Sequence, residues 1–145
     1  MSDEAQELLG KYDLIAAPAK PFLFCGSEDS MDAARRMLGA DYVPCACPPL
    51  PGSWKWVDLR PIGKRDGLIF PDGDPDSWQD MNNLAKRLHV DLGCTFSIID
   101  TTGEREDWTL ADWAGSRDEL VQWARTRKKV YPSPDPAPQD EAAQE

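Results

Sequence analysis

Short apolar runs alternate along the chain with longer segments in which apolar residues recur every three or four positions. The apolar runs cover residues 22–25, 42–47, 67–71 and 94–99. Runs of four to eight apolar residues bounded by turn formers are typical of strands that are buried on both faces, as in parallel sheets. We therefore predict a β-strand at each of these four positions.

The segments between and after these runs have helical periodicity. After a cap at Asp29 or Ser30, apolar residues recur with helical spacing as far as Leu38. Residues 76–91 form an amphipathic pattern that begins near Ser77, and Ser116 with Glu119 forms a capping box for a last helix. Strands that alternate with helices predict an α/β fold. We expect a Rossmann-like, mostly parallel four-stranded sheet that is flanked by about three helices.

The chain of 145 residues is long enough for one domain with a real core. Residues 1–20 are interpreted as an N-terminal lead-in, and residues 21–130 as the α/β domain. Residues 131–145 carry four acidic residues, four prolines and no basic residue. This composition is typical of disorder, so we expect a disordered acidic tail.

The chain has a net charge of −10, so it does not attract nucleic-acid backbones without a basic patch or a partner. No apolar run approaches the length of about 18 residues that a bilayer crossing requires, and the acidic N-terminus lacks the apolar region of a signal peptide. We therefore expect a cytoplasmic protein without membrane contact. Cys45 and Cys47 are too close together for a zinc knuckle, and the single histidine, His89, is distant in sequence.

The acidic turn Asp72-Gly73-Asp74 follows the run 67–71 directly. In open α/β sheets, binding sites form beyond the carboxyl ends of strands. Two carboxylates on such a turn can share Mg²⁺, which prefers oxygen ligands. The alternative is a surface turn with solvated aspartates, because Asp-Gly pairs are common in turns.

Several motifs in order carry a resemblance to a known family. They are FCGSED at 24–29, PGSW at 51–54, PIGKRD at 61–66, DGD at 72–74, and two Asp-Trp pairs within 106–113. This order over roughly residues 13–127 resembles the Toprim fold of primases, topoisomerases and related nucleases. The resemblance is closest to the Toprim modules of phage and mobile-element primase–helicases.

The resemblance implies Mg²⁺ (or Mn²⁺) held by Asp72 and Asp74 for nucleotidyl transfer in a DNA primase or replication system. The family places a catalytic glutamate where this chain has Cys25. A thiol does not replace a carboxylate as a Mg²⁺ ligand, and Glu28 and Asp29 are the nearest acidic residues that follow. Weak or absent activity of the chain alone is therefore expected. The implied partner is a replication protein such as a helicase or a primase subunit.

Two alternatives stay open at this stage. The chain could be a catalytically degenerate module that acts as a protein-interaction or nucleic-acid-mimicking subunit. Cys25 could also act as a nucleophile at a strand-to-helix turn, although a buried structural thiol is the simpler interpretation.

Basic and aromatic residues gather between the second and third predicted strands. Lys55, Arg60, Lys64 and Arg65 lie near Trp54 and Trp56, a composition suited to single-stranded nucleic acid or, equally, to a solvated loop. Two further groups of charged residues could take part in binding. They are a basic helix end at Arg125, Arg127, Lys128 and Lys129, and two loop acids, Asp107 and Asp112, that could join a metal cluster.

Overall fold

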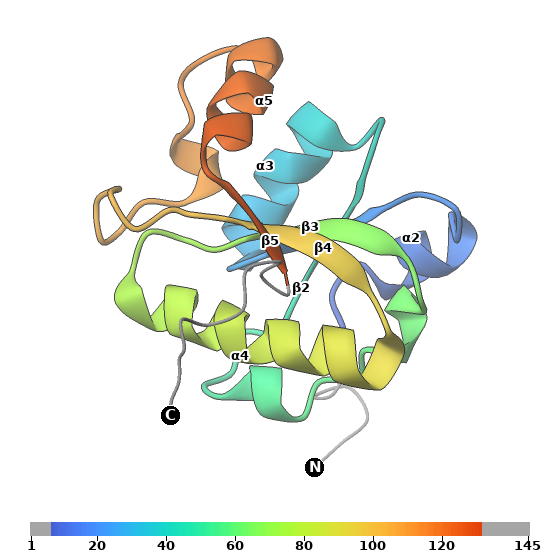
Figure 1. Ribbon diagram of the computed structural model, residues 1–145. Coiled ribbons are helices and arrows are strands. Elements are labelled where there is room, and N and C mark those ends of the chain that lie inside the picture. The colour runs from blue at the N-terminus through green and yellow to red at the C-terminus, as the bar shows by residue number, and fades with distance from the viewer. Residues whose placement is uncertain (1–6, 132–145) are drawn as a thin grey trace, which may run out of the picture.

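A five-stranded, mostly parallel sheet forms the centre of the protein (Figure 1). The computed structural model describes residues 7–131. The strands are β1 Phe22–Cys25, β2 Val43–Ala46, β3 Asp66–Phe70, β4 Thr95–Ile99 and β5 Lys128–Tyr131, in the spatial order β2-β1-β3-β4-β5. The first four strands are parallel to one another, whereas β5 is antiparallel to β4. The predicted Rossmann-like α/β fold is confirmed.

The fifth strand corrects the sequence interpretation of the chain near residue 128. Helix α5, Arg117–Thr126, ends before Lys128, so the predicted basic helix end lies partly in β5. Here β5 pairs with β4, and the Tyr131 ring stacks on Phe96 with 5.0 Å between ring centroids. Tyr131 therefore belongs to the domain. The rest of the predicted tail lies outside the described residues.

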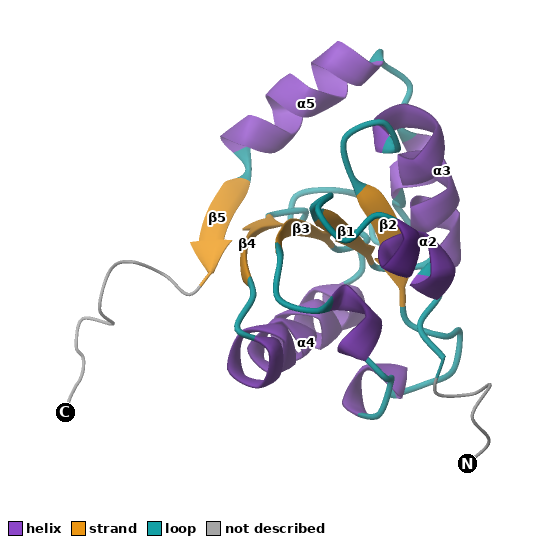
Figure 2. Ribbon diagram, turned by 90° about the vertical axis from the view of Figure 1, so that its right-hand side faces the viewer, coloured by secondary structure: helices purple, strands orange, loops and turns teal. Residues whose placement is uncertain are grey.

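The long helices cover opposite faces of the sheet. Figure 2 shows α3, Glu28–Leu38, and α5 on one side and α4, Pro75–Leu92, on the other. The alternation of side chains along β1 explains this arrangement. Phe22 and Phe24 pack in the cluster that contains the buried residues of α4, and Leu23 and Cys25 pack in the cluster that contains those of α3.

The helix boundaries follow from their capping residues. Ser27 caps α3 in place of the predicted Asp29 or Ser30, and Asp74 caps α4 ahead of the predicted Ser77. The predicted capping box of Ser116 and Glu119 is present at the start of α5.

Within the predicted lead-in, the described residues 7–20 pack against the α/β domain. Helix α2, Lys11–Ala16, places Leu14 in the core, and Leu8 is buried beside it. Leu9 also forms an isolated antiparallel bridge with Ala46, at the outer edge of β2. Apolar side chains of this segment therefore cover one edge of the sheet.

Replacement of Asp100 with asparagine is expected to make stability less dependent on pH. Hydrogen bonds from Thr102, and then the ion pair with Lys129 at 2.9 Å, lower the pKa of the Asp100 carboxyl to about 2. A lowered pKa stabilises the fold above the unfolded-state pKa, and this stability is lost as the pH falls from about 4 towards about 2. After allowance for solvent screening, we expect Asp100→Asn to lose roughly 1 kcal/mol at pH 7.

Urea denaturation at pH 7 and at pH 2.5 checks this expectation. Asp107→Asn is the control, since Asp107 also forms an ion pair, with Arg105, but is mostly exposed. If Asp100→Asn lowered the free energy of unfolding equally at both pH values, the predicted pH dependence would be wrong.

Candidate functional site

The candidate site lies where the chain leaves the two central strands in opposite directions. β1 and β3 are parallel neighbours, with Cys25 opposite Phe70. From β1 the chain enters α3 on one face, and from β3 it enters α4 on the other (Figures 1 and 2). In open α/β sheets this change of direction leaves a crevice at the carboxyl ends of the strands, where ligands bind.

Asp72 is held by contacts to three surrounding elements. Its carboxylate accepts a hydrogen bond from the Ser30 hydroxyl of α3 at 2.7 Å. Its backbone N–H donates to Ser77 Oγ of α4, and its carbonyl accepts from Thr101 Oγ1, each at 3.0 Å. Only 8% of the residue is exposed to solvent. Asp72 is therefore a buried connection between α3, α4 and the segment that follows β4.

The carboxylate of Asp74 has a different partner from that of Asp72, in the helix on the opposite face of the sheet. Its Oδ1 accepts a hydrogen bond from the Ser77 N–H at 2.7 Å and thereby caps α4. Between the two aspartates, the Gly73 N–H donates to the Trp108 carbonyl at 2.8 Å. A Cβ on Gly73 would lie 2.1 Å from the Arg105 carbonyl, so only glycine fits here. The turn is fixed with its two carboxylates directed to different helices.

The pKa of the Asp72 carboxyl is raised above its usual range, chiefly by burial. Hydrogen bonds from Ser30 and Ser27 lower it, whereas the neighbouring Asp74 and Asp29 carboxylates raise it. A raised pKa means that the ionised form of Asp72 is less favourable in the folded protein than in the unfolded chain. The two serine hydroxyls offset part of this cost.

Cys25, which occupies the position of the family glutamate, is completely buried. Its Sγ lies 3.7 Å from the Leu23 carbonyl, and burial raises the pKa of the thiol well above its ordinary value, with further increases from Cys45 and Asp72. A buried thiol with a raised pKa stays protonated near neutral pH and is a poor nucleophile. Burial therefore favours the structural interpretation of this cysteine over the nucleophilic one.

Glu28 and Asp29 are exposed in the first turn of α3. Acidic side chains at this position interact favourably with the helix dipole. Asp29 is close enough to influence the pKa of Asp72, while Glu28 lines a pocket that is described below. The structure thus brings Cys25, Asp29 and Asp72 into one neighbourhood and places Glu28 at its edge.

The four basic residues predicted to bind nucleic acid do not form one surface. Lys64 and Arg65 lie before β3, at the end of the sheet opposite Asp72, and Lys55 lies over the Trp54 ring with 5.7 Å from Nζ to the ring centroid. Arg60 forms a two-point ion pair with Asp58 at 2.8 and 2.9 Å. The guanidinium of Arg65 donates to five backbone carbonyls. Arg65 is therefore occupied in joining segments of the fold.

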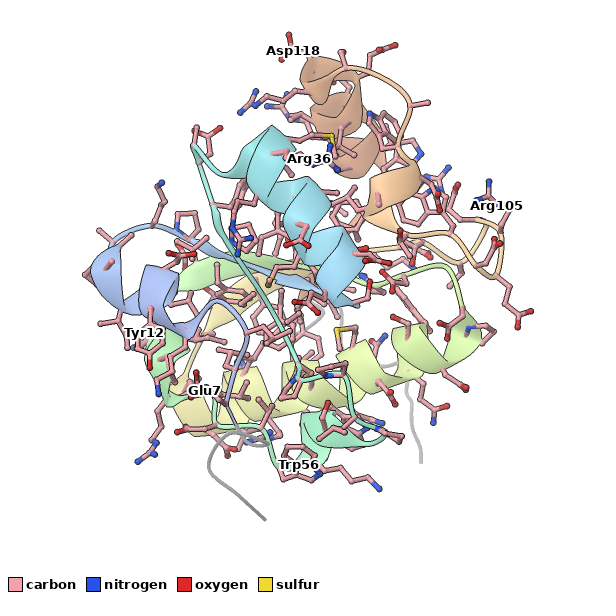
Figure 3. The ribbon with its side chains drawn as sticks, turned by 180° about the vertical axis from the view of Figure 1, so that it is seen from behind. Glu7, Tyr12, Arg36, Trp56, Arg105 and Asp118 are labelled. Atoms are coloured by element: carbon pink, nitrogen blue, oxygen red, sulfur yellow. The ribbon has the colours of Figure 1, made fainter. Side chains whose placement is uncertain are left out.

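The two loop acids interact with an arginine of their own loop. Arg105, which extends outward in Figure 3, pairs with Asp107 at 3.0 Å and with Asp112 at 3.3 Å. Asp112 also accepts a hydrogen bond from the Thr109 N–H in a capping box. These contacts explain the two acids as loop-stabilising residues.

A pocket of about 360 Å³ opens beside the turn, at the carboxyl ends of β1 and β2. Its walls come from the start of α3, from the loop 47–54 and from α4. Glu28 and Asp80 supply carboxylates, and Trp54 and Met81 supply apolar surface. The sequence interpretation did not include Asp80, because only the fold brings α4 alongside this loop.

The protein was compared with family models, with curated proteins and with solved structures. None of the three comparisons finds a match. The Toprim resemblance therefore stays a prediction that rests on the motifs. None of the helices within residues 7–131 is both long enough and apolar enough to cross a membrane.

The Mg²⁺ site that the Toprim resemblance implies stays a prediction. In the structure the carboxylate of Asp72 accepts a hydrogen bond from Ser30, and that of Asp74 caps α4. Within residues 7–131, no three His, Cys, Asp or Glu side chains are grouped to hold a metal ion.

The sequence interpretation missed Ser30, Ser77 and Thr101 as the partners of Asp72. These three hydroxyls reach it from three different elements. Ser30 and Ser77 were noted only as possible helix caps. Serine is a frequent helix-capping residue, so the local sequence gives no signal of the buried contact.

Proposed function

We propose that this chain is a Toprim-like module of a DNA primase or replication system that has become catalytically degenerate and acts as a protein-interaction subunit. One observation carries the proposal. The carboxylate of Asp72 is buried in a hydrogen bond from α3, whereas that of Asp74 caps α4 on the other face. Both aspartates of the acidic turn thus stabilise the fold.

The buried Cys25 supports the same conclusion. Phosphodiester transfer needs charge neutralisation at the phosphate oxygens and a group that moves a proton. At the position of the family glutamate, the chain has a buried thiol whose pKa is raised well above its ordinary value. Neither requirement is supplied by the described side chains in their present positions, so nucleotidyl transfer by this chain alone is expected to be absent.

A partner protein of the replication machinery, such as a helicase or a primase subunit, is the proposed target. The chain carries a net charge of −10, which favours a basic partner surface. The same charge disfavours direct contact with DNA or RNA, so contact with nucleic acid is proposed to come through the partner. A cytoplasmic location is part of this proposal.

A second candidate is a Mg²⁺- or Mn²⁺-binding module with weak nucleotidyl transfer. The observation that favours it is the group of carboxylates around the turn, since Asp74 and Asp29 both raise the pKa of Asp72. A cation would relieve this repulsion, but Asp72 would have to leave Ser30 to bind it.

Calorimetric titration with Mn²⁺ and Mg²⁺ distinguishes the two candidates. For the degenerate module we expect no saturable binding, and the same heats for the wild type and for the Asp72→Asn/Asp74→Asn variant. Asp107→Asn/Asp112→Asn is the control, since it also removes two acids from a loop. Binding that is present in the wild type and in the control but lost in the first variant would overturn the proposal in favour of the metal-dependent candidate.

A further inference from the structure

The pocket between α3, α4 and the loop 47–54 shares Ser27 and Ser77 with the surroundings of Asp72, but its own carboxylates and its aromatic side chain take no part in the hydrogen bonds of Asp72. Its carboxylates, Glu28 and Asp80, come from two helices on opposite faces of the sheet. Its apolar surface comes from Trp54 and Met81 and from residues 47–51, which are Cys47, Pro48, Pro49, Leu50 and Pro51. A concave site that combines an aromatic side chain with a few polar groups is typical of a binding pocket.

The loop that forms one wall of the pocket is held in place from within the fold. The buried Ser53 donates from its hydroxyl to the Pro48 carbonyl at 2.8 Å. Arg87 of α4 donates to the carbonyls of Trp54 and Val57 at 2.7 and 2.9 Å. A preformed wall reduces the entropy that is lost when a ligand binds.

The charge around the pocket is negative. Burial raises the pKa of the Asp80 carboxyl, and the nearby carboxylates of Asp76 and Asp74 raise it further. Lys55 lowers the pKa of Asp80, and its ammonium group lies over the Trp54 ring. The guanidinium of Arg87 donates to backbone carbonyls. Lys55 and a hydrogen bond from the Trp54 side chain compensate Asp80 only in part, so a ligand with a positive charge would meet a surface on which carboxylates predominate.

We propose that this pocket binds an arginine side chain of a partner protein. The guanidinium would pair with Asp80 and Glu28, and its planar face would stack on Trp54. This inference rests on the proposed interaction function and specifies the chemistry of the partner at the contact.

Arginine matches the pocket better than other ligands. Its planar guanidinium presents several N–H donors to carboxylates and also stacks on aromatic rings, whereas the ammonium of lysine is a compact, strongly hydrated charge. A nucleic-acid phosphate would be repelled by the same carboxylates. The volume of about 360 Å³ also leaves room for residues that flank the arginine.

The test is an NMR titration of the whole ¹⁵N-labelled chain with N-acetyl-arginine amide. The uncharged N-acetyl-citrulline amide has nearly the same shape and serves as the ligand control. We expect saturable shifts of the Trp54 indole N–H and of amides within residues 50–54, with a dissociation constant on the order of 1 mM, since one side chain supplies few contacts.

Three variants test whether binding depends on the Asp80 charge and on the Trp54 ring. Asp80→Asn is expected to weaken binding by about twofold to fivefold, the effect of one partly exposed charge pair. Trp54→Leu should also weaken it by removing the aromatic face. Asp118→Asn on α5 should leave binding unchanged. Figure 3 shows Asp118 at the opposite end of the molecule from Trp56, which follows the loop.

Three results would each overturn the inference. They are equal shifts with the citrulline amide, equal binding of N-acetyl-lysine amide, and unchanged binding by Asp80→Asn while its spectrum stays that of the folded protein. These results are independent of the metal titration. Metal binding at Asp72 and Asp74 would overturn the proposed function. If neither the metal nor the arginine amide bound, only the assignment of this pocket would be overturned.

Discussion

Replacement of Arg65 with alanine is expected to lower the free energy of unfolding by about 2–4 kcal/mol, because several charge-assisted hydrogen bonds are lost together. The guanidinium donates to Leu14, Ala17 and Lys20 in the N-terminal segment, and to Pro61 and Ile62 before β3. It therefore joins two segments that lie about fifty residues apart in the chain. Without it, these carbonyls lose their donor.

Arg65→Lys tests whether a positive charge alone is sufficient for the stabilising effect of Arg65. A single ammonium group cannot reach all five carbonyls, so we expect an intermediate loss of roughly 1–2 kcal/mol. Arg36→Ala on the exposed side of α3 is the control, and Figure 3 shows Arg36 there. Its effect should stay within about 0.5 kcal/mol.

Urea denaturation, followed by tryptophan fluorescence, measures all three variants. A wild-type stability for Arg65→Ala would contradict the structural role. That result would favour the nucleic-acid-binding role that the sequence predicts for Arg65.

Replacement of Ser30 with alanine is expected to lower the free energy of unfolding by about 2–3 kcal/mol, since two buried groups lose their partner. The Ser30 hydroxyl donates to Asp72 at 2.7 Å and accepts from the Leu110 N–H at 2.9 Å. It is buried, and so are both partners. Its loss leaves a charged oxygen and a backbone N–H without a hydrogen bond.

The effect of Ser30→Ala is expected to depend on pH. Burial raises the pKa of Asp72, and a group with a raised folded-state pKa destabilises the fold as the pH rises above its unfolded-state value of about 4. The Ser30 hydroxyl lowers this pKa, so its removal raises it further. The loss of stability should therefore be smaller at pH 3, where Asp72 is protonated in both states, than at pH 7.

A double-mutant cycle with Asp72→Asn isolates the pair. We expect the cost of Ser30→Ala to be smaller, and nearly independent of pH, in the Asp72→Asn background. Ser97→Ala, at a half-buried strand position outside this network, is the control. Equal costs of Ser30→Ala in both backgrounds would show that the two side chains do not interact.

The sequence determined the elements whose signals are local. The apolar runs correctly predicted the first four strands, and the spacing of Ser116 and Glu119 predicted the start of α5. The acidic turn was also placed correctly at the carboxyl end of β3. Each of these features depends on residues within a few positions of one another, so a periodic pattern or a cap reveals it.

Features that depend on distant partners were decided by the tertiary structure. β5 has mostly exposed side chains, so its apolar pattern is weak, and it is a strand because its backbone pairs with β4. The first twenty residues were expected to lie outside the domain, but Leu14 completes a core that is built from residues far along the chain.

The candidate site shows the same division most clearly. The position of Asp72 could be predicted from the sequence, but its environment could not, because its partner Ser30 lies 42 residues earlier in the chain. Arg65 was assigned to the surface on its charge alone, whereas its hydrogen-bond acceptors come mainly from α2 and the residues that follow it. Whether a charged side chain faces solvent or holds the fold together depends on the groups that folding brings to it, and their distance along the chain hides them from any local pattern.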